Sequence, residues 1–528
     1  MKVASEAPAR AASPPDGAAT ADQGSTPRWL VVVAVLVIVV GIVMRFVALS
    51  ELWLDEALSV NIARLPLGDI PNWLRHDGAP PLYYFLLHVW TDVFGTSNLA
   101  VRSLSGVLSV ATLVPMWFAG RRIAGRAGGW IAVLILASSP FAITFGSETR
   151  MYSLMMLLVT VGYLALRRLL EHPSLGRQAV VALVTALLLY THYWSFYLLA
   201  AVGGLLVWQA WRGADADRRH AARSALVAIV AGVITFLPWV PTFLYQSKHT
   251  GTPWGDPIFM TASFAFALRD FAGGEHSEAY AFLVVLITLT IVTVFGRAID
   301  RFRIELDVRT RPGVRAEAGV WVVTLLLGGA AAFLTRGTFA GRYASVLYPL
   351  FVLVLVYGVT VFADRRARAV LLAIVAIFGL GSGLRVVLDD RTEARPVADE
   401  IRAGSKPGDL VLYCPDQLGP SVSRLLGGKR LVQLTFPAGD RPELVDWVDY
   451  KGRRSHVNTN AFAQGVLDRA GTGSTIWYVV AVQYRGGNEG RCDAILQSLN
   501  AARPGGRQLV QANDKYGEFF ALFEYPPR

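Results

Sequence analysis

Charged side chains are scarce in this chain. Asp, Glu, Lys and Arg make up 17% of its 528 residues, whereas hydrophobic residues make up 53%. Soluble domains carry about 25% charged residues. Apolar runs of about twenty residues recur through most of the chain, each long enough to cross roughly 30 Å of hydrocarbon. These features exclude an ordinary soluble protein and predict a polytopic α-helical membrane protein.

The charges that remain are unevenly placed. The formal net charge is +11, and most of it comes from arginine. The arginines occur in short clusters between the apolar runs, which is the positive-inside pattern of membrane proteins. The basic balance therefore predicts a membrane partner and no nucleic acid.

No small-residue cleavage site follows the first apolar run, Trp29–Leu49. The run is also too long for a signal peptide, so we expect an uncleaved first span. Residues 1–28 lack periodicity and are predicted to be a disordered cytoplasmic tail. Residues 29–388 are the predicted transmembrane part, with about eleven helices. The expected spans are 29–49, 99–119, 128–145, 149–167, 178–193, 195–211, 222–244, 278–296, 317–335, 343–363 and 369–387.

Arginine clusters predict which side each connection occupies. They lie on alternate connections, at residues 121–126, 167–177, 212–223, 297–315 and 365–368. The other connections have fewer cations and contain Asp55, Glu56, Asp69, Asp77, Glu148, Asp256 and Glu275. Because clustered arginines stay in the cytoplasm, we expect a multi-pass protein of the cell (inner) membrane. Its N-terminus is then cytoplasmic, and residues after Leu388 are extracytoplasmic.

Residues 389–528 change in character. Strand-like runs (409–414, 430–436, 474–483 and 518–524) alternate with helix-like runs (417–426, 460–470 and 491–502). About 140 residues suffice for one α/β domain, and this one lacks a phosphate-binding glycine loop. The only two cysteines, Cys414 and Cys492, lie here on the oxidising side. They form a disulfide or remain two buried thiols.

The first external loop, residues 50–97, is long and contains the adjacent carboxylates Asp55 and Glu56. Two carboxylates where a chain leaves the bilayer cost desolvation energy and indicate a functional site. Residues 82–94 place Tyr83 and other apolar residues at helical spacing, which suits a helix lying in the membrane interface. Such a helix beside carboxylates could guide a lipid-linked substrate, or it could be an ordinary aromatic belt.

The second external turn reads Ser147-Glu148-Thr149-Arg150-Met151-Tyr152. It is expected to open the fourth span, with Ser147 as N-cap. The helix N-terminus and the planar guanidinium of Arg150 together favour an anion such as phosphate. The alternative is an ion pair between Glu148 and Arg150 that only ends the helix.

Other polar groups are expected on the same side. His192 and Tyr193 lie between the fifth and sixth spans, Lys248 follows the seventh, and Arg342 precedes the tenth. A histidine at a helix end is often only a polar anchor, and arginines can snorkel to lipid headgroups. Together, however, cations opposite a carboxylate-rich loop are suited to holding a lipid phosphate beside a base.

Four motifs in this order, on one predicted membrane face, resemble the GT-C superfamily of membrane glycosyltransferases. More narrowly, they resemble bacterial relatives of the dolichyl-phosphate-mannose protein mannosyltransferases. The motifs are Leu52–Glu56, Asp77–Tyr84, Ser147–Tyr152 and Thr191–Tyr193. Relatives often have histidine before the Pro80-Pro81 pair, where this chain has Ala79. The tail around 413–417 resembles the C-terminal domains of actinobacterial members.

The resemblance implies a sugar donor on a polyprenyl phosphate. Asp55 would be the general base and Glu56 would orient the acceptor or the sugar. Arg150, Arg342 and Lys248 would bind the donor phosphate. Residues implied in substrate binding are Asp77, Tyr83, Glu148, Tyr152, His192 and Tyr193. A single displacement would invert the anomeric configuration. Mannose is the default sugar, and the acceptor is a cell-envelope glycan, lipid or protein. A divalent metal stays open.

The alternative is a transporter or flippase for polyprenyl-linked sugars or lipids. Transporters usually show internal repeats and polar groups at mid-bilayer. This sequence shows no convincing repeat, and its carboxylates cluster at one predicted surface. The pattern therefore favours the glycosyltransferase interpretation.

Overall fold

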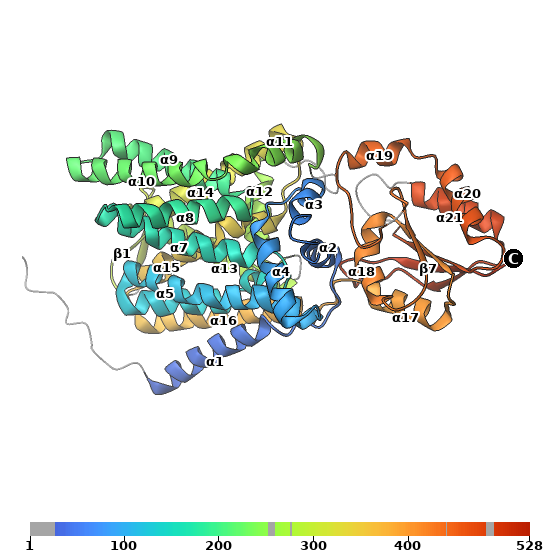
Figure 1. Cartoon of the computed structure of the whole chain (residues 1–528). Coiled ribbons are helices and arrows are strands. Elements are labelled where there is room, and N and C mark those ends of the chain that lie inside the picture. The colour runs from blue at the N-terminus through green and yellow to red at the C-terminus, as the bar shows by residue number, and fades with distance from the viewer. Residues whose placement is uncertain (1–26, 252–258, 275–276, 302, 440, 482–489) are drawn as a thin grey trace, which may run out of the picture.

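The computed structural model describes residues 27–251, 259–274, 277–301, 303–439, 441–481 and 490–528. A helical bundle, called here the membrane part, extends to residue 388 (Figure 1). The C-terminal part follows and contains a five-stranded sheet. Helices α2 and α3 lie between the two parts. The predicted order, a polytopic helical part followed by an α/β part, is confirmed.

Every predicted span corresponds to a helical segment. The helices are α1 (Arg28–Met44), α5 (Asn98–Ala137), α7 (Tyr152–Glu171), α8 (Leu175–Thr191), α9 (Ser195–Arg212), α10 (Ala216–Ile234), α13 (Ser277–Phe295), α14 (Arg315–Leu334), α15 (Tyr348–Val361) and α16 (Arg365–Leu388). Helix α5 contains two of the predicted spans, because non-helical dihedrals at Ala124 and Gly125 bend it sharply.

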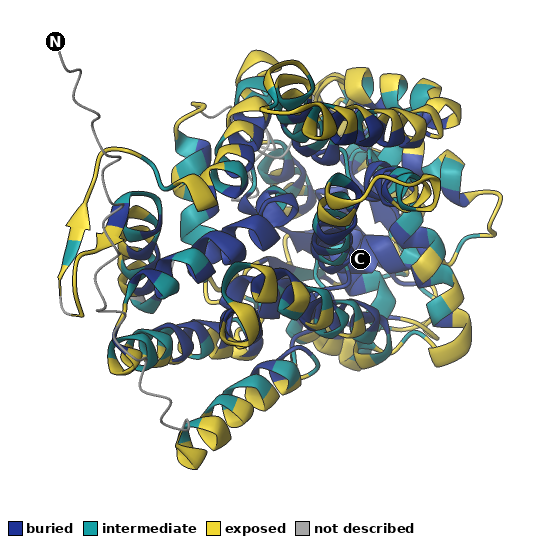
Figure 2. Ribbon diagram, turned by 90° about the vertical axis from the view of Figure 1, so that its left-hand side faces the viewer, coloured by how far each residue is buried: buried dark blue, intermediate teal, exposed yellow. Residues whose placement is uncertain are grey.

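The outer faces of these helices are apolar. Leu36, Val230 and Ile377 are exposed by 56%, 54% and 70%, although none of them is polar. Figure 2 shows such exposed faces on the peripheral helices around a buried centre. Six helical segments in the described ranges are long and apolar enough to cross a bilayer, and three shorter apolar helices join them. The chain is a multi-pass membrane protein.

Residues 50–97, the predicted first external loop, are largely helical. They form α2 (Leu54–Ala63), α3 (Ile70–Asp77) and α4 (Leu82–Phe94). Helix α4 coincides with the predicted interfacial helix. Helix α2 was not expected, because Trp53 at its N-cap position supplies no side-chain cap, and without a cap the sequence gives no clear start signal.

The predicted role of Ser147 as a helix N-cap is wrong. Helix α7 begins at Tyr152 after Met151, with no side-chain cap. Ser147 instead ends the short helix α6 (Pro140–Gly146), whose own N-cap is Ser139. The break at Ser138 and Ser139 also ends the predicted span 128–145 early. Residues 147–151 therefore form a turn between two helices.

Shorter elements connect the spans. They are η1 (Leu237–Trp239), α11 (Val240–His249), α12 (Ala262–Phe271), η2 (Pro312–Val314), η3 (Gly341–Val346) and the hairpin β1 (Gly296–Ala298) with β2 (Ile304–Leu306). The predicted disordered tail up to residue 26, the loop residues 252–258 and Glu275 lie outside the described residues. Arg342 lies on η3, just before α15.

The sheet of the C-terminal part has the order β4-β3-β5-β7-β6. Its strands are β3 (Leu410–Cys414), β4 (Val432–Thr435), β5 (Ile476–Val480), β6 (Arg507–Val510) and β7 (Ala521–Tyr525). Strands β4, β3 and β5 are mutually parallel. Strand β7 pairs antiparallel with β5, and β6 pairs antiparallel with β7. The helices are α17 (Ala394–Gly404), α18 (Gly419–Leu425) after η4 (Asp416–Leu418), α19 (Tyr450–His456), α20 (Thr459–Ala470) and α21 (Arg491–Ala502). A disulfide joins Cys414 at the end of β3 to Cys492 in α21.

The C-terminal part is anchored on α3 and α11. The backbone N–H of Trp447 donates to the carbonyl oxygen of His76 at 3.0 Å, and that of Asp449 donates to His249 at 2.8 Å. The His76 ring pairs with Asp446 at 3.0 Å. These contacts bring the segment before α19 against α11 and against α3, which belongs to residues 50–97.

We expect loss of the disulfide to destabilise the C-terminal part. The bond spans a sequence separation of 78, and cross-links of this kind stabilise by about 2–4 kcal/mol, mainly by restricting the unfolded chain. Reductant should therefore lower the melting temperature of the purified protein. A Cys414→Ser/Cys492→Ser variant should have the melting temperature of the reduced wild type, and reductant should not change it. Equal melting of the oxidised and reduced wild type would contradict this expectation.

Candidate functional site

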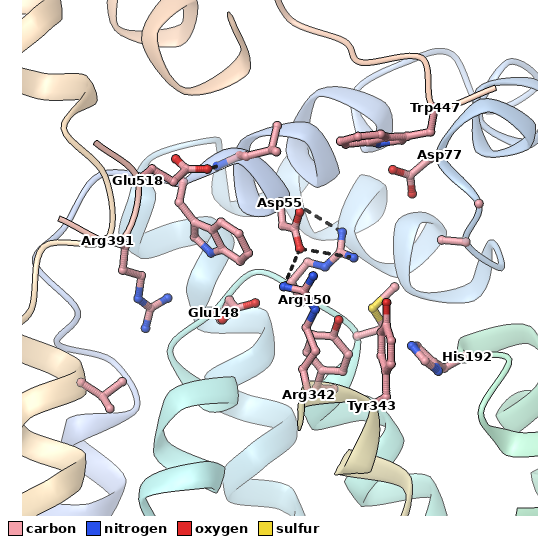
Figure 3. Close-up of a pocket in the computed structure, with 18 of the residues that line it drawn as sticks. Asp55, Asp77, Glu148, Arg150, His192, Arg342, Tyr343, Arg391, Trp447 and Glu518 are labelled. Atoms are coloured by element: carbon pink, nitrogen blue, oxygen red, sulfur yellow. Dashed lines mark hydrogen bonds and ion pairs between the residues drawn. The ribbon is translucent and has the colours of Figure 1, made fainter. Parts of the chain in front are cut away.

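A cavity of about 880 Å³ lies where the loops at one end of the membrane part meet the C-terminal part. Its walls come from the start of α2, the 147–151 turn, η3, the segment after α16 and the loop before β7 (Figure 3). Of the predicted site residues, the cavity is lined by Asp55, Asp77, Glu148, Arg150, Tyr152, His192, Tyr193 and Arg342. Segments far apart in the sequence thus converge on one space.

Asp55 lies in the first turn of α2 and faces two arginines. Its Oδ2 atom is 3.2 Å from Arg342 Nη1 and 3.9 Å from Arg150 Nη2. Arg150 also donates to the Ser59 hydroxyl at 3.0 Å, which fixes its direction. The side chains of Asp55, Arg150 and Arg342 are 17%, 13% and 21% exposed, so they form a partly solvated cluster at the cavity wall.

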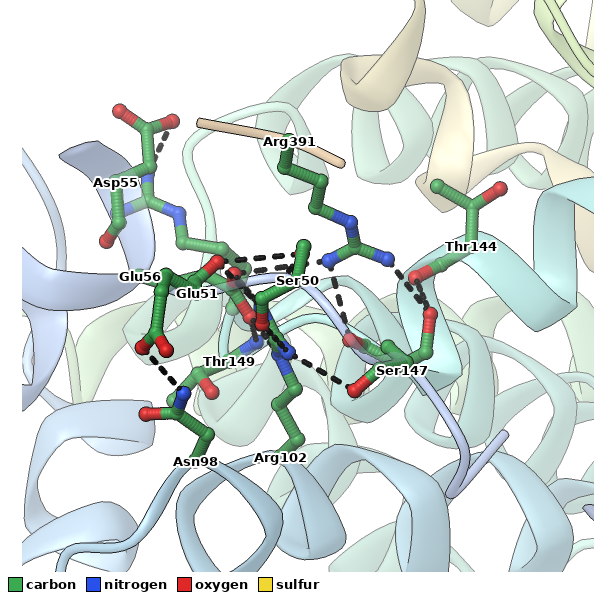
Figure 4. Close-up of polar contacts among 12 residues, drawn as sticks. Ser50, Glu51, Asp55, Glu56, Asn98, Arg102, Thr144, Ser147, Thr149 and Arg391 are labelled. Atoms are coloured by element: carbon green, nitrogen blue, oxygen red, sulfur yellow. Dashed lines mark hydrogen bonds and ion pairs between the residues drawn. The ribbon is translucent and has the colours of Figure 1, made fainter. Parts of the chain in front are cut away.

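Glu56 points the other way, into the protein. Its carboxylate is fully buried and accepts two hydrogen bonds from Arg102, at 2.8 and 2.6 Å (Figure 4). The backbone N–H of Thr149 donates to it at 2.9 Å. Burial acts to raise the pKa of Glu56, but Arg102, Arg391 and the Thr149 amide outweigh burial and lower it. Glu56 does not line the cavity, so the structure does not support a direct contact with acceptor or sugar.

The 147–151 turn is held by these same groups. Besides the Thr149 contact, Arg391 donates to the Ser147 carbonyl at 3.1 Å and hydroxyl at 2.8 Å, and lies 3.6 Å from Glu56. One amide of this turn, that of Thr149, is therefore already occupied by the Glu56 carboxylate. Arg150 pairs with Asp55, not with Glu148, so the simple ion-pair alternative for this turn is not what the structure contains.

Glu148 faces the cavity with little solvent around it. It is 5% exposed, and its Oε1 atom has no hydrogen-bond partner among the described residues. Burial raises the pKa of Glu148 to about 7, with Arg391 opposing the rise and Glu56 adding to it. The group therefore exchanges a proton near neutral pH, unlike Glu56.

The remaining cavity residues are polar or aromatic. Tyr84 donates to Asp77 at 2.8 Å, so Asp77 is directed by the neighbouring α4 helix. The His192 ring packs between Tyr152 and Tyr343, with centroids 5.9 and 5.4 Å away. The backbone N–H of Trp194 donates to His192 Nδ1 at 3.2 Å, so that nitrogen carries no proton. Tyr193 lines the cavity too.

Besides Glu56, two more predicted site residues do not line the cavity. Tyr83 is fully buried, and its hydroxyl pairs with Ser105 at 2.9 Å. Ser105 donates in turn to the carbonyl oxygen of Arg150 at 3.1 Å, so Tyr83 supports the turn instead of facing a substrate. Lys248 is exposed near the end of α11 and does not line the cavity. The structure therefore does not bring Lys248 together with Arg150 and Arg342.

The described residues contain no group of three or more His, Cys, Asp or Glu side chains that could hold a metal ion. The positive charge facing Asp55 comes instead from arginine. An anion that enters the cavity meets guanidinium groups with planar, bidentate donor geometry, which suits a phosphate.

Four important residues were missed in the sequence. Arg102 lies inside a predicted span, and an arginine there needs a buried partner; that signal could have identified Glu56 as structural. Arg391, Trp447 and Glu518 come from the C-terminal part and line the cavity. No local pattern marks them, because only the docking of the C-terminal part brings them to the site.

Known proteins share this architecture. Residues 78–240 match the family model described as dolichyl-phosphate-mannose-protein mannosyltransferase. No curated protein matches the chain. ArnT from Cupriavidus metallidurans bound to undecaprenyl phosphate is 14% identical, with a TM-score of 0.55. The apo state of ArnT is 13% identical, with a TM-score of 0.56, and each match covers 94% of this chain and 98% of the ArnT chain.

The chain has the GT-C fold. The family-model match over residues 78–240 agrees with the resemblance of the motifs to mannosyltransferase relatives. The similarity to ArnT extends over nearly the whole chain, including the C-terminal part. Within this fold, the cavity is lined by residues from all four motifs.

Glu56 and Asp55 should differ sharply when each is made neutral. Breaking a buried, bidentate pair costs about 3–5 kcal/mol, because the remaining charge is left unpaired. Glu56→Gln should therefore lower the melting temperature of the purified protein strongly. Asp55→Asn should lower it much less, because water reaches Arg150 and Arg342. Equal shifts would contradict the division between a structural and a cavity carboxylate.

Proposed function

We propose that this protein is an inverting glycosyltransferase that moves a sugar from a polyprenyl-phosphate donor to an extracytoplasmic acceptor. The observation that carries the proposal is Asp55, a carboxylate that lines a large cavity between the guanidinium groups of Arg150 and Arg342. The match to a mannosyltransferase family model supports it. So does the undecaprenyl phosphate named in the ArnT structure of the same fold.

The two arginines suit the donor phosphate. Their guanidinium groups are fixed in advance, since Arg150 is held by Ser59 and by Asp55. The phosphate gains negative charge as it leaves the sugar, and preorganised cations stabilise charge that develops in the transition state. Glu148 lies beside these arginines in the cavity wall and contacts the donor or the acceptor in this proposal.

Asp55 suits the role of general base. The acceptor oxygen forms a bond to the anomeric carbon while the bond from that carbon to the phosphate oxygen breaks. The acceptor proton passes to Asp55, and the bonding electrons leave with the polyprenyl phosphate. A single displacement of this kind inverts the configuration. A positioned carboxylate contributes about 10²–10⁴-fold to such a step.

Donor binding also prepares the base. In the structure, Arg342 and Arg150 neutralise the charge of Asp55. A phosphate that accepts hydrogen bonds from these arginines competes with Asp55 for them. The carboxylate is then available to the acceptor hydroxyl, so proton transfer follows the arrival of the donor.

Mannose is the first donor sugar to test, because the matching family model carries that name. The acceptor is a glycan, lipid or protein of the cell envelope. In this proposal residues 1–28 are a cytoplasmic tail and residues 29–388 form the catalytic membrane domain. Residues 389–528 form an extracytoplasmic domain, because the arginine-rich connections remain in the cytoplasm.

We expect Asp55→Asn to lower the rate of sugar transfer by at least about 10²-fold, because no base then accepts the proton of the acceptor hydroxyl. Membranes with equal amounts of each variant would be given radiolabelled polyprenyl-phosphate sugars and native envelope acceptors.

Arg342→Gln should raise the donor KM as well as lower kcat. Binding of polyprenyl phosphate should survive in Asp55→Asn.

Asp92→Asn is the matched control, because Asp92 is a 70% exposed carboxylate on α4 outside the cavity wall. It should transfer sugar as the wild type does. Labelled donor that crosses the membrane without transfer, and regardless of Asp55→Asn, would instead identify a transporter.

A further inference from the structure

Glu518 is a carboxyl group of the C-terminal part that reaches the proposed catalytic helix. It lies just before β7, is 7% exposed and lines the cavity. Its Oε1 atom accepts a hydrogen bond at 3.0 Å from the backbone N–H of Leu54, the residue before Asp55 (Figure 3). A residue 464 positions away in the chain is thus in contact with the first turn of α2.

This contact replaces the missing cap of α2. The first N–H groups of a helix lack partners within the helix and need an external acceptor. The N-cap residue of α2, Trp53, supplies no side-chain cap. Glu518 satisfies one of these N–H groups and so fixes the position at which α2, and with it Asp55, begins.

The backbone of Glu518 is equally well fixed. Its N–H donates to the Arg391 carbonyl at 2.8 Å, and its carbonyl accepts from the Glu393 N–H at 2.9 Å. The segment after α16 and the loop before β7 thus form a short parallel bridge at Thr392 and Glu518. Glu518 is held from both sides, so the direction of its carboxyl group is set before any substrate arrives.

The second carboxyl oxygen has a different environment. Oε2 is buried and has no hydrogen-bond partner among the described residues. An unpaired buried polar atom is unfavourable, so such an atom at a cavity wall is suited to a ligand partner. The first oxygen holds the helix, and the second remains for whatever enters.

The surroundings favour the protonated form of Glu518. Burial raises the pKa of Glu518 to about 8, and Asp55 and Glu56 add to the rise, whereas the Leu54 amide and Thr392 oppose it. Other charged or titratable groups on the surrounding elements are Glu148 across the cavity, Asp390 and Arg391 on the paired segment, and Asp514, Lys515 and Tyr516 on its own loop. Below about pH 8 the carboxyl group therefore carries a proton and can donate a hydrogen bond.

We propose that Glu518 is an acceptor-binding residue of the active site. One oxygen holds the first turn of α2, and the other, protonated, donates a hydrogen bond to an oxygen of a hydroxyl-bearing acceptor beside Asp55. The proposal rests on the proposed glycosyltransferase function. It assigns Glu518 to the acceptor and not to the donor, because Arg150 and Arg342 provide the phosphate site from the membrane part.

The test is acceptor kinetics across pH. In the wild type the acceptor KM should rise as pH passes about 8, because ionised Glu518 loses its donor proton and repels Asp55. Glu518→Gln keeps an oxygen for the Leu54 N–H and an NH2 group to donate, and it does not titrate. Its acceptor KM should stay flat through this range. The donor KM should be unchanged in both proteins.

Glu518→Ala loses both hydrogen bonds and should raise the acceptor KM by about 3–10-fold at neutral pH. Hydrogen exchange of the peptide containing Leu54 should be faster in this variant and unchanged in Glu518→Gln. This second measurement requires no enzymatic activity. Faster exchange confined to the Leu54 peptide indicates loss of the cap, whereas faster exchange throughout the protein indicates a variant that has failed to fold.

Glu524→Gln is the matched control. Glu524 lies on β7, pairs with Arg507 at 2.6 Å and does not line the cavity. The acceptor KM of this variant should rise as pH passes about 8, as it does in the wild type. If wild type transfers sugar but Glu518→Gln shows the same rise, the inference on Glu518 is wrong and the proposed function stands. If the wild type transfers no sugar from any donor, the proposed function itself fails.

Discussion

The buried ion pair between Glu56 and Arg102 is the contact on which the geometry of the site depends. It joins the first turn of α2 to the first span of α5, with both side chains almost fully removed from solvent. The same carboxylate accepts from Thr149 and lies near Arg391, so it also ties in the 147–151 turn and the segment after α16. A buried pair with this many contacts has one satisfactory arrangement, and loss of either partner leaves an unpaired charge. Because Asp55 is the neighbour of Glu56 in the first turn of α2, this arrangement also fixes the position of Asp55.

Adjacent residues of the same chemical type thus have different surroundings. Neighbouring side chains on a helix point in directions about 100° apart. This turns Glu56 into the protein and Asp55 into the cavity. Glu56 is held ionised by Arg102, whereas Glu148 and Glu518 meet few cations at close range and keep protons near neutral pH. The site therefore contains carboxyl groups with distinct protonation states.

The sequence predicts long-range periodic features well and contacts between distant segments poorly. Long apolar runs identified the spans, and short apolar runs separated by Gly and Pro identified the strands around Leu410–Cys414 and Ile476–Val480. Helix α2 escaped because its cap comes from Glu518, which is distant in the chain. The roles of Arg391 and Trp447 escaped for the same reason. Ser147 was misassigned because a serine before polar residues resembles an N-cap, although the helix starts five residues later.

The loop before β7 follows every membrane helix in the chain, yet it completes the wall of the cavity. During synthesis the membrane helices therefore leave the ribosome long before Glu518 and its neighbours do. Until the C-terminal part has folded against the membrane part, α2 has no cap and the cavity has an open side. A chain made only as far as residue 388 therefore contains Asp55, Arg150 and Arg342 but lacks Arg391 and Glu518. The cavity can therefore be completed only after all the membrane helices have been made.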